Sequence, residues 1–321
     1  MQEFQLIEKF FKPLTKSHPA AQNLSDDVAK ISLKKNEELV ISKDLFVEDI
    51  HFLRQDGGFK IASKLLRTNL SDLAASGATP IHYLLGFSKS KDLDPKFIQE
   101  FARGLKSVQD EFNLCLIGGD TVSAEKLFFS ITIFGVVKKG KNLLRSAAQD
   151  GDLIYTSGTI GDAFLGLNAL PTPANKALID RHFFPTPRIE LGKKLLEQKL
   201  SKCAVDVSDG LLADLRHICT TSKLDAEIYL SHIPISQAAK KFLKINPEIK
   251  ILDLLCGGDD YELVFTANPK NKKKIAELSK ALKLDLTCIG TLKKSENKKF
   301  QVTLRDAENK KITIKKFGYE H

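Results

Sequence analysis

The chain has 321 residues, of which 42% are hydrophobic and 28% are charged, and its formal net charge is +9. This much apolar material excludes a wholly disordered chain, and the length suggests two domains. The longest strongly apolar stretch, residues 127–137, is too short to span a bilayer, and the first residues lack the apolar core of a secretory signal. We therefore expect a soluble, cytoplasmic protein with no membrane partner.

The positive charge is concentrated near the C-terminus. Residues 267–316 hold fifteen Lys or Arg and five Asp or Glu, a net charge of +10. The lysines occur in runs such as Lys272–Lys274, without the regular interleaving of aromatic side chains on which bases stack. We expect a solvated lysine-rich face and no nucleic-acid partner, although weak binding of polyanions is left open.

The five cysteines are scattered, and no two are spaced as CxxC. Each has apolar neighbours, so the pattern favours buried small hydrophobic residues over a disulfide framework, a structural zinc site or a catalytic thiol. The five are Cys115, Cys203, Cys219, Cys256 and Cys288.

The first half of the chain is predicted to mix helices and strands. Apolar residues at helical spacing predict a short helix that ends before Pro13, and the same spacing predicts a longer helix followed by Gly77, a typical C-terminal cap. Two short apolar runs rich in branched and aromatic residues are typical of strands. In chain order we expect a helix at 4–11, a strand at 38–42, helices at about 59–76 and 95–112, and strands at 114–120 and 127–137.

The polar, glycine-containing stretch 138–152 indicates a domain boundary near residue 145, which gives domains 1–145 and 146–321. The second half begins with a strand, a turn and a helix over 152–167, and the same order recurs over 203–219. Strands are expected near 226–230, 261–267 and 286–292. This alternation indicates an α/β or α+β chain in two lobes.

Aspartates recur beside predicted strands and glycines, many of them in apolar surroundings such as IGGDT, AVDVSDGL and CGGDDYEL. Burying several carboxylates together is costly unless cations neutralise them. Oxygen ligands of this kind suit Mg²⁺, and the glycine pairs at 118–119 and 257–258 let backbone N–H groups approach phosphates closely. Without a P-loop or protein-kinase motif, the sequence points to another kind of metal-assisted phosphate chemistry.

Six segments and the C-terminal FGYEH resemble the thiamine-monophosphate kinase family, in that family's order and over nearly the whole chain. This family belongs with the aminoimidazole ribonucleotide synthetase-like proteins. The most specific motifs are NLSDLAA, SDGL and DYEL. The segments are 42–52, 69–80, 117–122, 144–163, 206–215 and 257–266, with the terminal residues 317–321.

The resemblance implies a two-domain PurM-like fold, in which the N-terminal sheet pairs with its counterpart to form a homodimer barrel and a C-terminal α/β domain closes over the cleft. It implies phosphorylation of thiamine monophosphate by ATP, with several Mg²⁺ ions; a contribution from K⁺ is left open. The acceptor phosphate is already ionised at neutral pH, so positioning and charge neutralisation would suffice for catalysis.

The resemblance also implies roles for individual residues. Asp120, Arg145 and Asp209 would act directly in the transfer. Gly119, Asp120, Arg145 and Ser208 match nucleotide-binding positions, and His51, Asp259 and Tyr319 match positions that contact the thiamine phosphate. The matching metal positions are Asp27, Ser42, Asp44, Asp72, Asp120, Asp206 and Asp209.

Several positions depart from the family pattern. Asn23-Leu24-Ser25 replaces Gly-Ile-Gly, Asp259 replaces a glutamate, and the segment after GGDT lacks a glycine. Lys43 stands where the family has a metal-binding threonine, and an ammonium group cannot bind Mg²⁺. We hypothesise that Lys43 replaces one cation by its own charge and lowers the number of metal ions bound.

Three alternatives remain open. The first is another member of the superfamily, which the sequence disfavours. Selenophosphate synthetase needs a reactive Cys or Sec near the N-terminus, but no cysteine precedes Cys115, and the hydrogenase-maturation type needs a C-terminal cysteine, whereas this chain ends at His321. Aminoimidazole ribonucleotide synthetase is not expected to end in GYEH. A catalytically impaired protein that binds ATP and thiamine phosphate is favoured by Lys43 and the missing glycines. A nucleic-acid binder ranks last.

Overall fold

The computed structural model describes residues 3–296 and 298–319. The chain divides into two compact units, Met1–Leu73 with Ala78–Gly140 (unit 1) and Ala74–Gly77 with Lys141–His321 (unit 2). The domain boundary expected near residue 145 stays a prediction. Among the described residues, no helix combines the length and the apolar character that a bilayer span requires.

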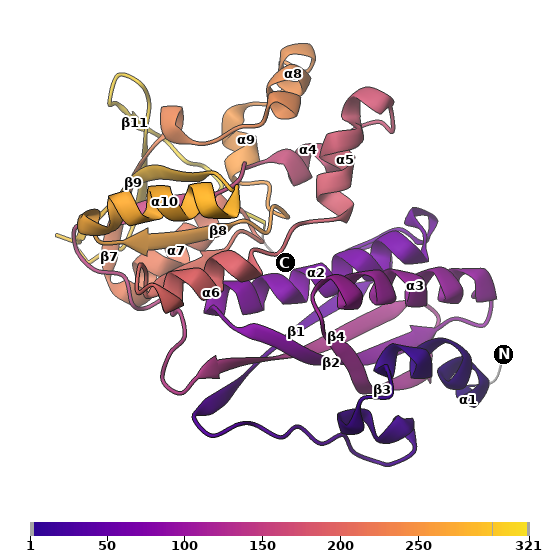
Figure 1. The fold of residues 1–321 in the computed structure, drawn as a ribbon. Helices are drawn as coiled ribbons and strands as arrows, with labels where there is room; N and C mark the ends of the chain where they lie inside the picture. Colours follow the sequence, from indigo (N-terminus) through magenta and orange to yellow (C-terminus); the bar gives the residue numbers. More distant parts are fainter. Residues whose placement is uncertain (1–2, 297, 320–321) are drawn as a thin grey trace. The chain divides into compact units, whose positions relative to one another are not determined.

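Unit 1 contains a four-stranded sheet in the order β1-β4-β2-β3, in which β4 pairs antiparallel with β1 and β2, and β2 pairs parallel with β3 (Figure 1). The three strands expected here are confirmed, and the first is longer than expected. A fourth strand, β2, was missed by the sequence reasoning because its apolar run begins at Pro80 and shows no clear period. The strands are β1 (Glu37–Val47), β2 (Thr79–Lys89), β3 (Cys115–Ser123) and β4 (Phe128–Lys138).

Helices α2 (Gly58–Ser76) and α3 (Pro95–Glu111) lie on one face of this sheet, and both were expected (Figure 1). Phe87, Phe101 and Phe129 form the aromatic core between the layers, with ring centroids 4.5–5.3 Å apart. Gly77 follows α2 with a φ of +73°, the left-handed conformation expected of a C-terminal cap.

The N-terminal segment is a chain of short helical turns that contact α3 and the edge strand β3. The helix expected over residues 4–11 is confirmed as an α turn followed by a π turn. The turns are α1 (Glu3–Leu6), η1 (Ile7–Phe11), η2 (Lys12–Thr15) and η3 (Pro19–Leu24), and unit 1 also contains η4 (Arg54–Asp56).

Unit 2 contains a seven-stranded mixed sheet in the order β11-β10-β7-β9-β5-β8-β6, in which only β7 and β10 among these neighbours run parallel. Every residue of β8 is buried, so both faces of the sheet are covered. The strands are β5 (Leu153–Ser157), β6 (Cys203–Asp206), β7 (Leu224–Tyr229), β8 (Leu263–Ala267), β9 (Leu286–Lys294), β10 (Val302–Arg305) and β11 (Lys311–Ile312).

The main core of unit 2 lies between α7 and the sheet, where Leu211, Leu215 and Ile218 of the helix pack with strand residues such as Val205 and Val264. The expected strand–turn–helix segments at 152–167 and 203–219 are confirmed. The helices are α4 (Asp162–Asn168), α5 (Lys176–Phe183), α6 (Ile189–Glu197), α7 (Leu211–Ser222), α8 (Gln237–Ile245), α9 (Ile251–Leu255) and α10 (Lys272–Leu282), with turns η5 (Pro173–Asn175), η6 (Leu230–His232) and η7 (Pro269–Asn271).

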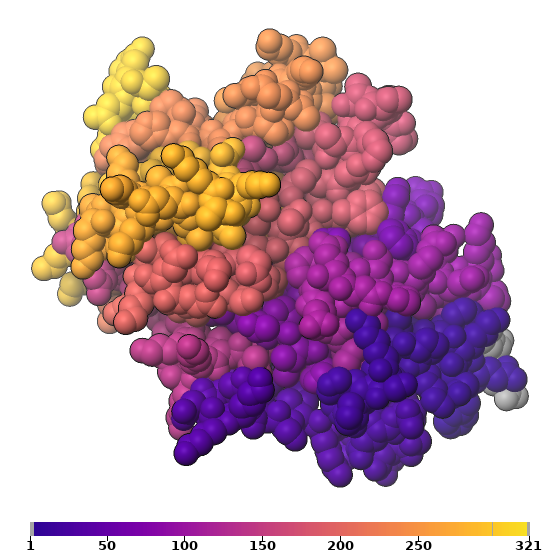
Figure 2. Space-filling model, in the orientation of Figure 1, coloured from indigo at the N-terminus to yellow at the C-terminus, as the bar shows by residue number. Residues whose placement is uncertain are grey.

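The lysine-rich segment forms a solvated face, as expected. On α10, Ile275 and Leu278 are buried, whereas the lysines at 272–274 and 280 are exposed. Figure 2 shows this helix, in yellow-orange, at the surface of unit 2.

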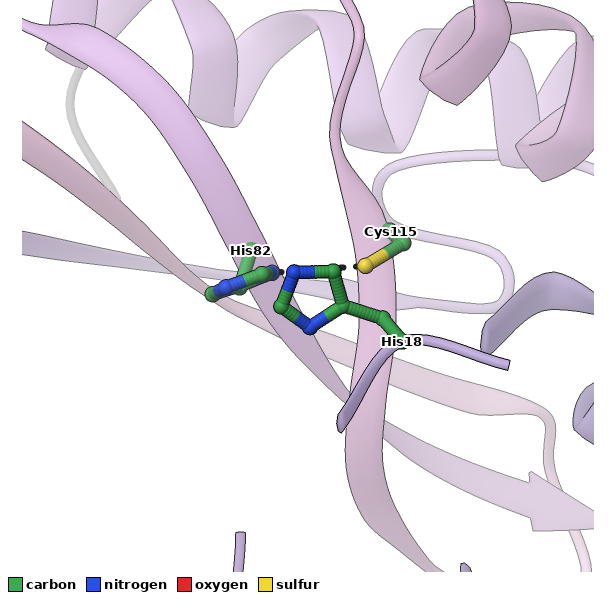
Figure 3. A group of neighbouring side chains, drawn as sticks. All are labelled: His18, His82 and Cys115. Atoms are coloured by element: carbon green, nitrogen blue, oxygen red, sulfur yellow. Dashed lines mark hydrogen bonds between the residues drawn. The ribbon is translucent and has the colours of Figure 1, made fainter. Parts of the chain in front are cut away.

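All five cysteines are free thiols, and three of them are buried. Cys115 differs from the others in its neighbours, because His18 and His82 lie beside it where the N-terminal segment crosses β2 and β3 (Figure 3).

Candidate functional site

Strand β1 turns two of the predicted metal ligands toward α2. The Ser42 hydroxyl donates a hydrogen bond to the Asp72 carboxylate, and the Asp44 backbone N–H donates to Asn69 Oδ1 at 3.2 Å. Asn69 and Asp72 are three residues apart on α2 and therefore share one face of that helix. The structure thus brings Ser42, Asp44 and Asp72 together, half-buried at the junction of β1 and α2.

The opposite face of the same sheet lines a cavity of about 800 Å³. Asp27, Lys43, Gly119 and Asp120 lie in its wall, and both carboxylates are exposed. Side chains alternate across a strand, so Lys43 faces away from Ser42 and Asp44. The predicted metal ligands of unit 1 therefore form two groups on opposite faces of the sheet.

The Lys43 side chain extends along the sheet face that lines the cavity. Its ammonium group donates to Ser130 Oγ at 2.5 Å and to Thr132 Oγ1 at 3.3 Å. Ser130 is opposite Gly86, and Gly86 is opposite Asp120, so the ammonium and the Asp120 carboxylate lie on one side of the sheet, roughly 10 Å apart at the usual strand spacing. The positive charge of Lys43 therefore acts on the cavity and not on the group around Asp72.

Gly119 has a packing role that the sequence reasoning did not foresee. A Cβ atom at this position would lie 2.0 Å from the backbone oxygen of Leu85 on the neighbouring strand. The close approach of β2 and β3 therefore requires glycine here. Its role in nucleotide binding stays a prediction.

His51 lies in the turn that follows β1. Its Nδ1 accepts a hydrogen bond from the Val47 backbone N–H at 3.2 Å, and its ring stacks on Phe46 with centroids 5.7 Å apart. These contacts fix the imidazole at the end of β1. Contact with a thiamine phosphate stays a prediction.

In unit 2, the loop between β6 and α7 gathers several carboxylates. One oxygen of Asp214, in the first turn of α7, accepts the backbone N–H groups of Ser208, Asp209 and Gly210 at 3.0–3.2 Å. Burial, together with the nearby charges of Asp206 and Asp209, raises the pKa of Asp214 to about 8. Carboxylates held this close are the arrangement that a cation relieves.

Asp209, Asp214 and His217 each have a potential ligand atom within 4.8 Å of the other two. Asp209 was a predicted metal ligand, whereas Asp214 was missed. The spacing of Asp209 and Asp214 across the start of a helix was the available signal, because an acidic residue in the first turn often binds the preceding N–H groups.

Two distant segments join this loop through backbone hydrogen bonds. The Asp259 N–H donates to the Ser208 carbonyl at 2.8 Å, and the Tyr319 N–H donates to the Asp209 carbonyl at 2.9 Å. Gly258, with a φ of +74°, allows the approach, since a Cβ there would lie 2.4 Å from the Ser208 carbonyl oxygen. The structure therefore brings together predicted nucleotide, metal and substrate residues, and the Tyr319 side chain is 52% exposed beside them.

Arg145 lies apart from this loop. Its carbonyl accepts a hydrogen bond from Ser222 Oγ at the C-terminal end of α7, whereas Asp209 precedes the N-terminal end. A helix of 12 residues is about 18 Å long, so unit 2 does not bring the Arg145 backbone to the carboxylates. The Arg145 side chain is exposed, and its role stays a prediction.

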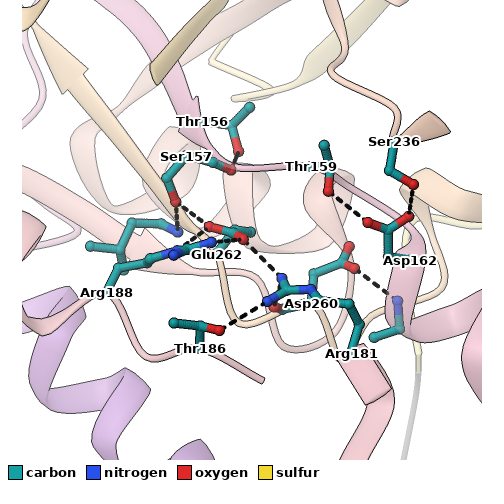
Figure 4. A network of polar contacts seen from close by, with 12 residues as sticks. Thr156, Ser157, Thr159, Asp162, Arg181, Thr186, Arg188, Ser236, Asp260 and Glu262 are labelled. Atoms are coloured by element: carbon teal, nitrogen blue, oxygen red, sulfur yellow. Dashed lines mark hydrogen bonds and ion pairs between the residues drawn. The ribbon is translucent and has the colours of Figure 1, made fainter. Parts of the chain in front are cut away.

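An ionic network surrounds the buried Asp260 and Glu262, which follow Asp259 in the chain (Figure 4). Glu262 is 1% exposed and receives hydrogen bonds from the guanidinium groups of Arg181 and Arg188 and from the Ser157 hydroxyl. The Asp260 carboxylate accepts the backbone N–H groups of Gly161 and Ala163 at 2.7 and 3.3 Å. The sequence reasoning used DYEL only as a motif and missed this network, because its arginines lie about 80 residues away.

Asp259 makes side-chain contacts of its own. Its carboxylate accepts a hydrogen bond from the Tyr261 hydroxyl at 3.2 Å, and its second oxygen lies 3.5 Å from Nδ1 of the buried His182. Both partners fix the direction of the carboxylate. His182 was not among the residues expected from the sequence.

Comparisons with known proteins agree with this architecture. Residues 25–137 match the family described as AIR synthase related protein, N-terminal domain, and residues 149–303 match its C-terminal domain. The chain is 37% identical to thiamine-monophosphate kinase of Haemophilus influenzae, over 100% of this chain and 98% of the relative. It is 35% identical to thiamine-monophosphate kinase of Escherichia coli, over 99% and 98%.

Solved structures give the same relation. A thiamine-monophosphate kinase from Stenotrophomonas maltophilia superposes with a TM-score of 0.84 at 35% identity, covering 95% of this chain and 96% of the other. AaThiL, complexed with AMPPCP and TMP, superposes with a TM-score of 0.78 at 28% identity, covering 99% and 97%. The two-domain PurM-like α+β fold expected from the sequence is thereby confirmed.

Proposed function

The chain belongs to the thiamine-monophosphate kinase family, and on that premise we propose that it phosphorylates thiamine monophosphate with ATP, giving thiamine diphosphate and ADP. The observation that carries the proposal is full-length similarity, at 33–37% identity, to relatives that bear this name. A relative that binds AMPPCP, an analogue of ATP, together with TMP supports the same pair of substrates.

The chemistry requires that two anions meet. The acceptor phosphate of thiamine monophosphate is ionised at neutral pH and attacks the γ-phosphorus of ATP while the bond to the β-phosphate oxygen breaks. No strong general base is needed, so the residues contribute mainly by positioning the two phosphates and neutralising their charge.

The acidic groups fit magnesium. Their donors are carboxylate and hydroxyl oxygens, which Mg²⁺ prefers. Burial and then the nearby charges of Asp206 and Asp209 raise the pKa of Asp214, so negative charge is unfavourable in this loop without a cation. When bound, magnesium would neutralise the negative charge of the polyphosphate. We propose Ser42, Asp44 and Asp72 as one group of ligands, Asp27 and Asp120 as a second, and Asp206 and Asp209 as a third.

The remaining predicted roles are proposals of the same kind. The exposed guanidinium of Arg145 is suited to bind phosphate oxygens in a bidentate manner, and Gly119, Asp120 and Ser208 would complete the nucleotide site. Asp259 and Tyr319 lie beside Ser208 and Asp209 and would contact the thiamine moiety or its phosphate, together with His51. With Asp120 and Asp209, Arg145 would act directly on the transferred group.

We also propose a homodimer in which the four-stranded sheets of two copies close a barrel. Ile41, Leu45 and Val122 are 44–59% exposed and lie on the sheet face opposite α2 and α3. Exposed apolar residues on one sheet face support a protein–protein interface. Light scattering of the purified chain would detect the dimer, and charged substitutions at Ile41 and Leu45 are expected to dissociate it.

The test of the proposed activity is ADP release with thiamine monophosphate, with thiamine, and without acceptor, combined with chromatographic detection of thiamine diphosphate. We expect ADP and thiamine diphosphate in equal amounts, and only with thiamine monophosphate and Mg²⁺. ADP formation that does not depend on the acceptor would reject the proposal.

Lys43 supports one alternative, a protein that binds ATP and thiamine phosphate but is catalytically impaired. Its ammonium group lies in the cavity that contains Asp27 and Asp120, where a further magnesium ion would be repelled. Calorimetric binding of both ligands without formation of thiamine diphosphate would favour this alternative.

A further inference from the structure

Three nitrogen and sulfur donors, none of them a member of the oxygen-rich groups described above, converge in unit 1. His82 on β2 and Cys115 at the start of β3 are directly opposite in the parallel register, and Cys115 Sγ lies 3.3 Å from His82 Nδ1. His18 precedes η3, and its ring lies 4.6 Å from the His82 ring. One ligand atom from each residue lies within 4.8 Å of the other two (Figure 3).

These distances are close to those of a tetrahedral metal site. With zinc–sulfur and zinc–nitrogen bonds of about 2.3 and 2.1 Å, two ligands of one zinc ion lie about 3.6 Å apart. The strand pairing fixes His82 and Cys115 near this separation, and only the exposed His18 ring has to move inward. Because His18 is exposed, water would be the fourth ligand.

We propose that His18, His82 and Cys115 bind a zinc ion that fastens the N-terminal segment to the sheet. Two imidazoles and a thiolate are borderline-soft donors that select zinc and not magnesium. Cys115 packs in a small apolar cluster with Ala20, Ala21 and Ile117, so the metal would join the start of residues 19–31 to β2 and β3.

The two buried donors differ in protonation: burial raises the pKa of the Cys115 thiol, so a metal has to displace its proton, whereas burial keeps His82 neutral. Burial, and then the charge of His18, lower the pKa of His82 to about 4, so its imidazole is neutral and able to bind a metal at neutral pH. Binding displaces the Cys115 thiol proton to solvent. His18 Nδ1 now accepts the Ala20 N–H at 3.2 Å, and binding through Nε2 places a proton on Nδ1 and exchanges that hydrogen bond for water.

Zinc binding at His18 would also affect the segment that follows it in the chain, which carries Asp26 and Asp27. Both of these residues line the cavity of unit 1. A zinc ion at His18 would reduce the motion of this segment. The zinc proposal stands on its own donors and does not depend on the phosphotransfer activity.

The test uses full-length protein treated with a chelator and titrated with Co²⁺ or Zn²⁺ in excess Mg²⁺. We expect one Co²⁺ per chain with a thiolate-to-cobalt charge-transfer band and the visible bands of tetrahedral cobalt. Cys115→Ser should abolish the thiolate band, and His18→Ala, at an exposed position, should weaken binding at least about tenfold because one of three ligands is lost. Cys288→Ser and His232→Ala are matched controls that should bind as the parent does.

A second readout is amide hydrogen exchange. Zn²⁺ should slow exchange over residues 19–31 in the parent chain and not in His18→Ala. A thiolate band that persists in Cys115→Ser, equal affinity in His18→Ala and the parent, or no cobalt binding to the folded parent would overturn the proposal.

Discussion

Two carboxylate-rich segments of unit 2, residues 206–214 and 259–262, hold buried charge in different ways. In the second segment, two guanidinium groups converge on Glu262, so the protein supplies the countercharge itself. In the first, burial and then the charges of Asp206 and Asp209 raise the pKa of Asp214, while the groups that hold Asp214 are backbone N–H donors. The comparison supports a structural role for Glu262 and agrees with the cation-binding role proposed for Asp206 and Asp209.

The largest expected effect is on catalysis, from Asp209→Asn. Loss of a charged ligand should lower kcat by about 100-fold or more, the scale on which removal of one electrostatic contact to a transition state acts. Stability should not fall, because the substitution removes a like charge beside Asp214. The measurements are steady-state kinetics and thermal unfolding, with the exposed Asp285→Asn as the control. An Asp209→Asn variant that is active but unstable would instead indicate a structural role for Asp209.

Glu262→Gln should have the opposite effect: it should lower the stability of the fold more than it lowers kcat. It leaves two half-buried guanidinium groups without their buried countercharge, and breaking an ion pair of this kind costs about 3 kcal/mol. Chemical denaturation would measure the loss. The control Glu190→Gln removes an exposed pair with Lys193, which contributes at most about 1 kcal/mol. Equal stability of the two variants would show that the network around Glu262 is not structural.

A third prediction concerns pH. Burial raises the pKa of Asp260 to about 8, so the folded chain binds this proton more tightly than the unfolded chain does, where the pKa is about 4. The contribution to stability is therefore fully present below pH 4 and is lost as the pH rises toward 8. Asp260→Asn stays neutral and should flatten the fall of Tm over this range. Parallel Tm curves for the two proteins would contradict the assignment.

Much of the fold could be predicted from local patterns, but pairings between strands could not. The helices α2 and α3 follow clear apolar spacing, whereas β2 shows no clear period and was missed. The opposition of His82 and Cys115 depends on the register of two strands, which no spacing in the sequence encodes.

The candidate site shows the same limit. The motifs placed Asp44 and Asp120 at the ends of strands, whereas the structure places both within strands, β1 and β3, and only the sheet register shows that they face opposite sides. The alternation along β1 does separate Lys43 from Ser42 and Asp44, and this could have been inferred from the strand period alone. Contacts over long separations, such as Asp259 with Ser208, required the three-dimensional structure.

The smallest expected effect tests whether a side chain can stand in for a metal ion. Lys43→Thr removes the ammonium group from the cavity and supplies a hydroxyl oxygen, so one more Mg²⁺ should bind. The dependence of the rate on Mg²⁺ should become steeper, and the rate at low Mg²⁺ should fall by no more than about fivefold, since an exposed charge contributes about 1 kcal/mol or less. Lys43→Met, which removes the charge without supplying an oxygen, should be slower at all Mg²⁺ concentrations. If the parent and Lys43→Thr show the same dependence of the rate on Mg²⁺, Lys43 does not replace a cation, and the proposed binding of Mg²⁺ in unit 1 is independent of this side chain.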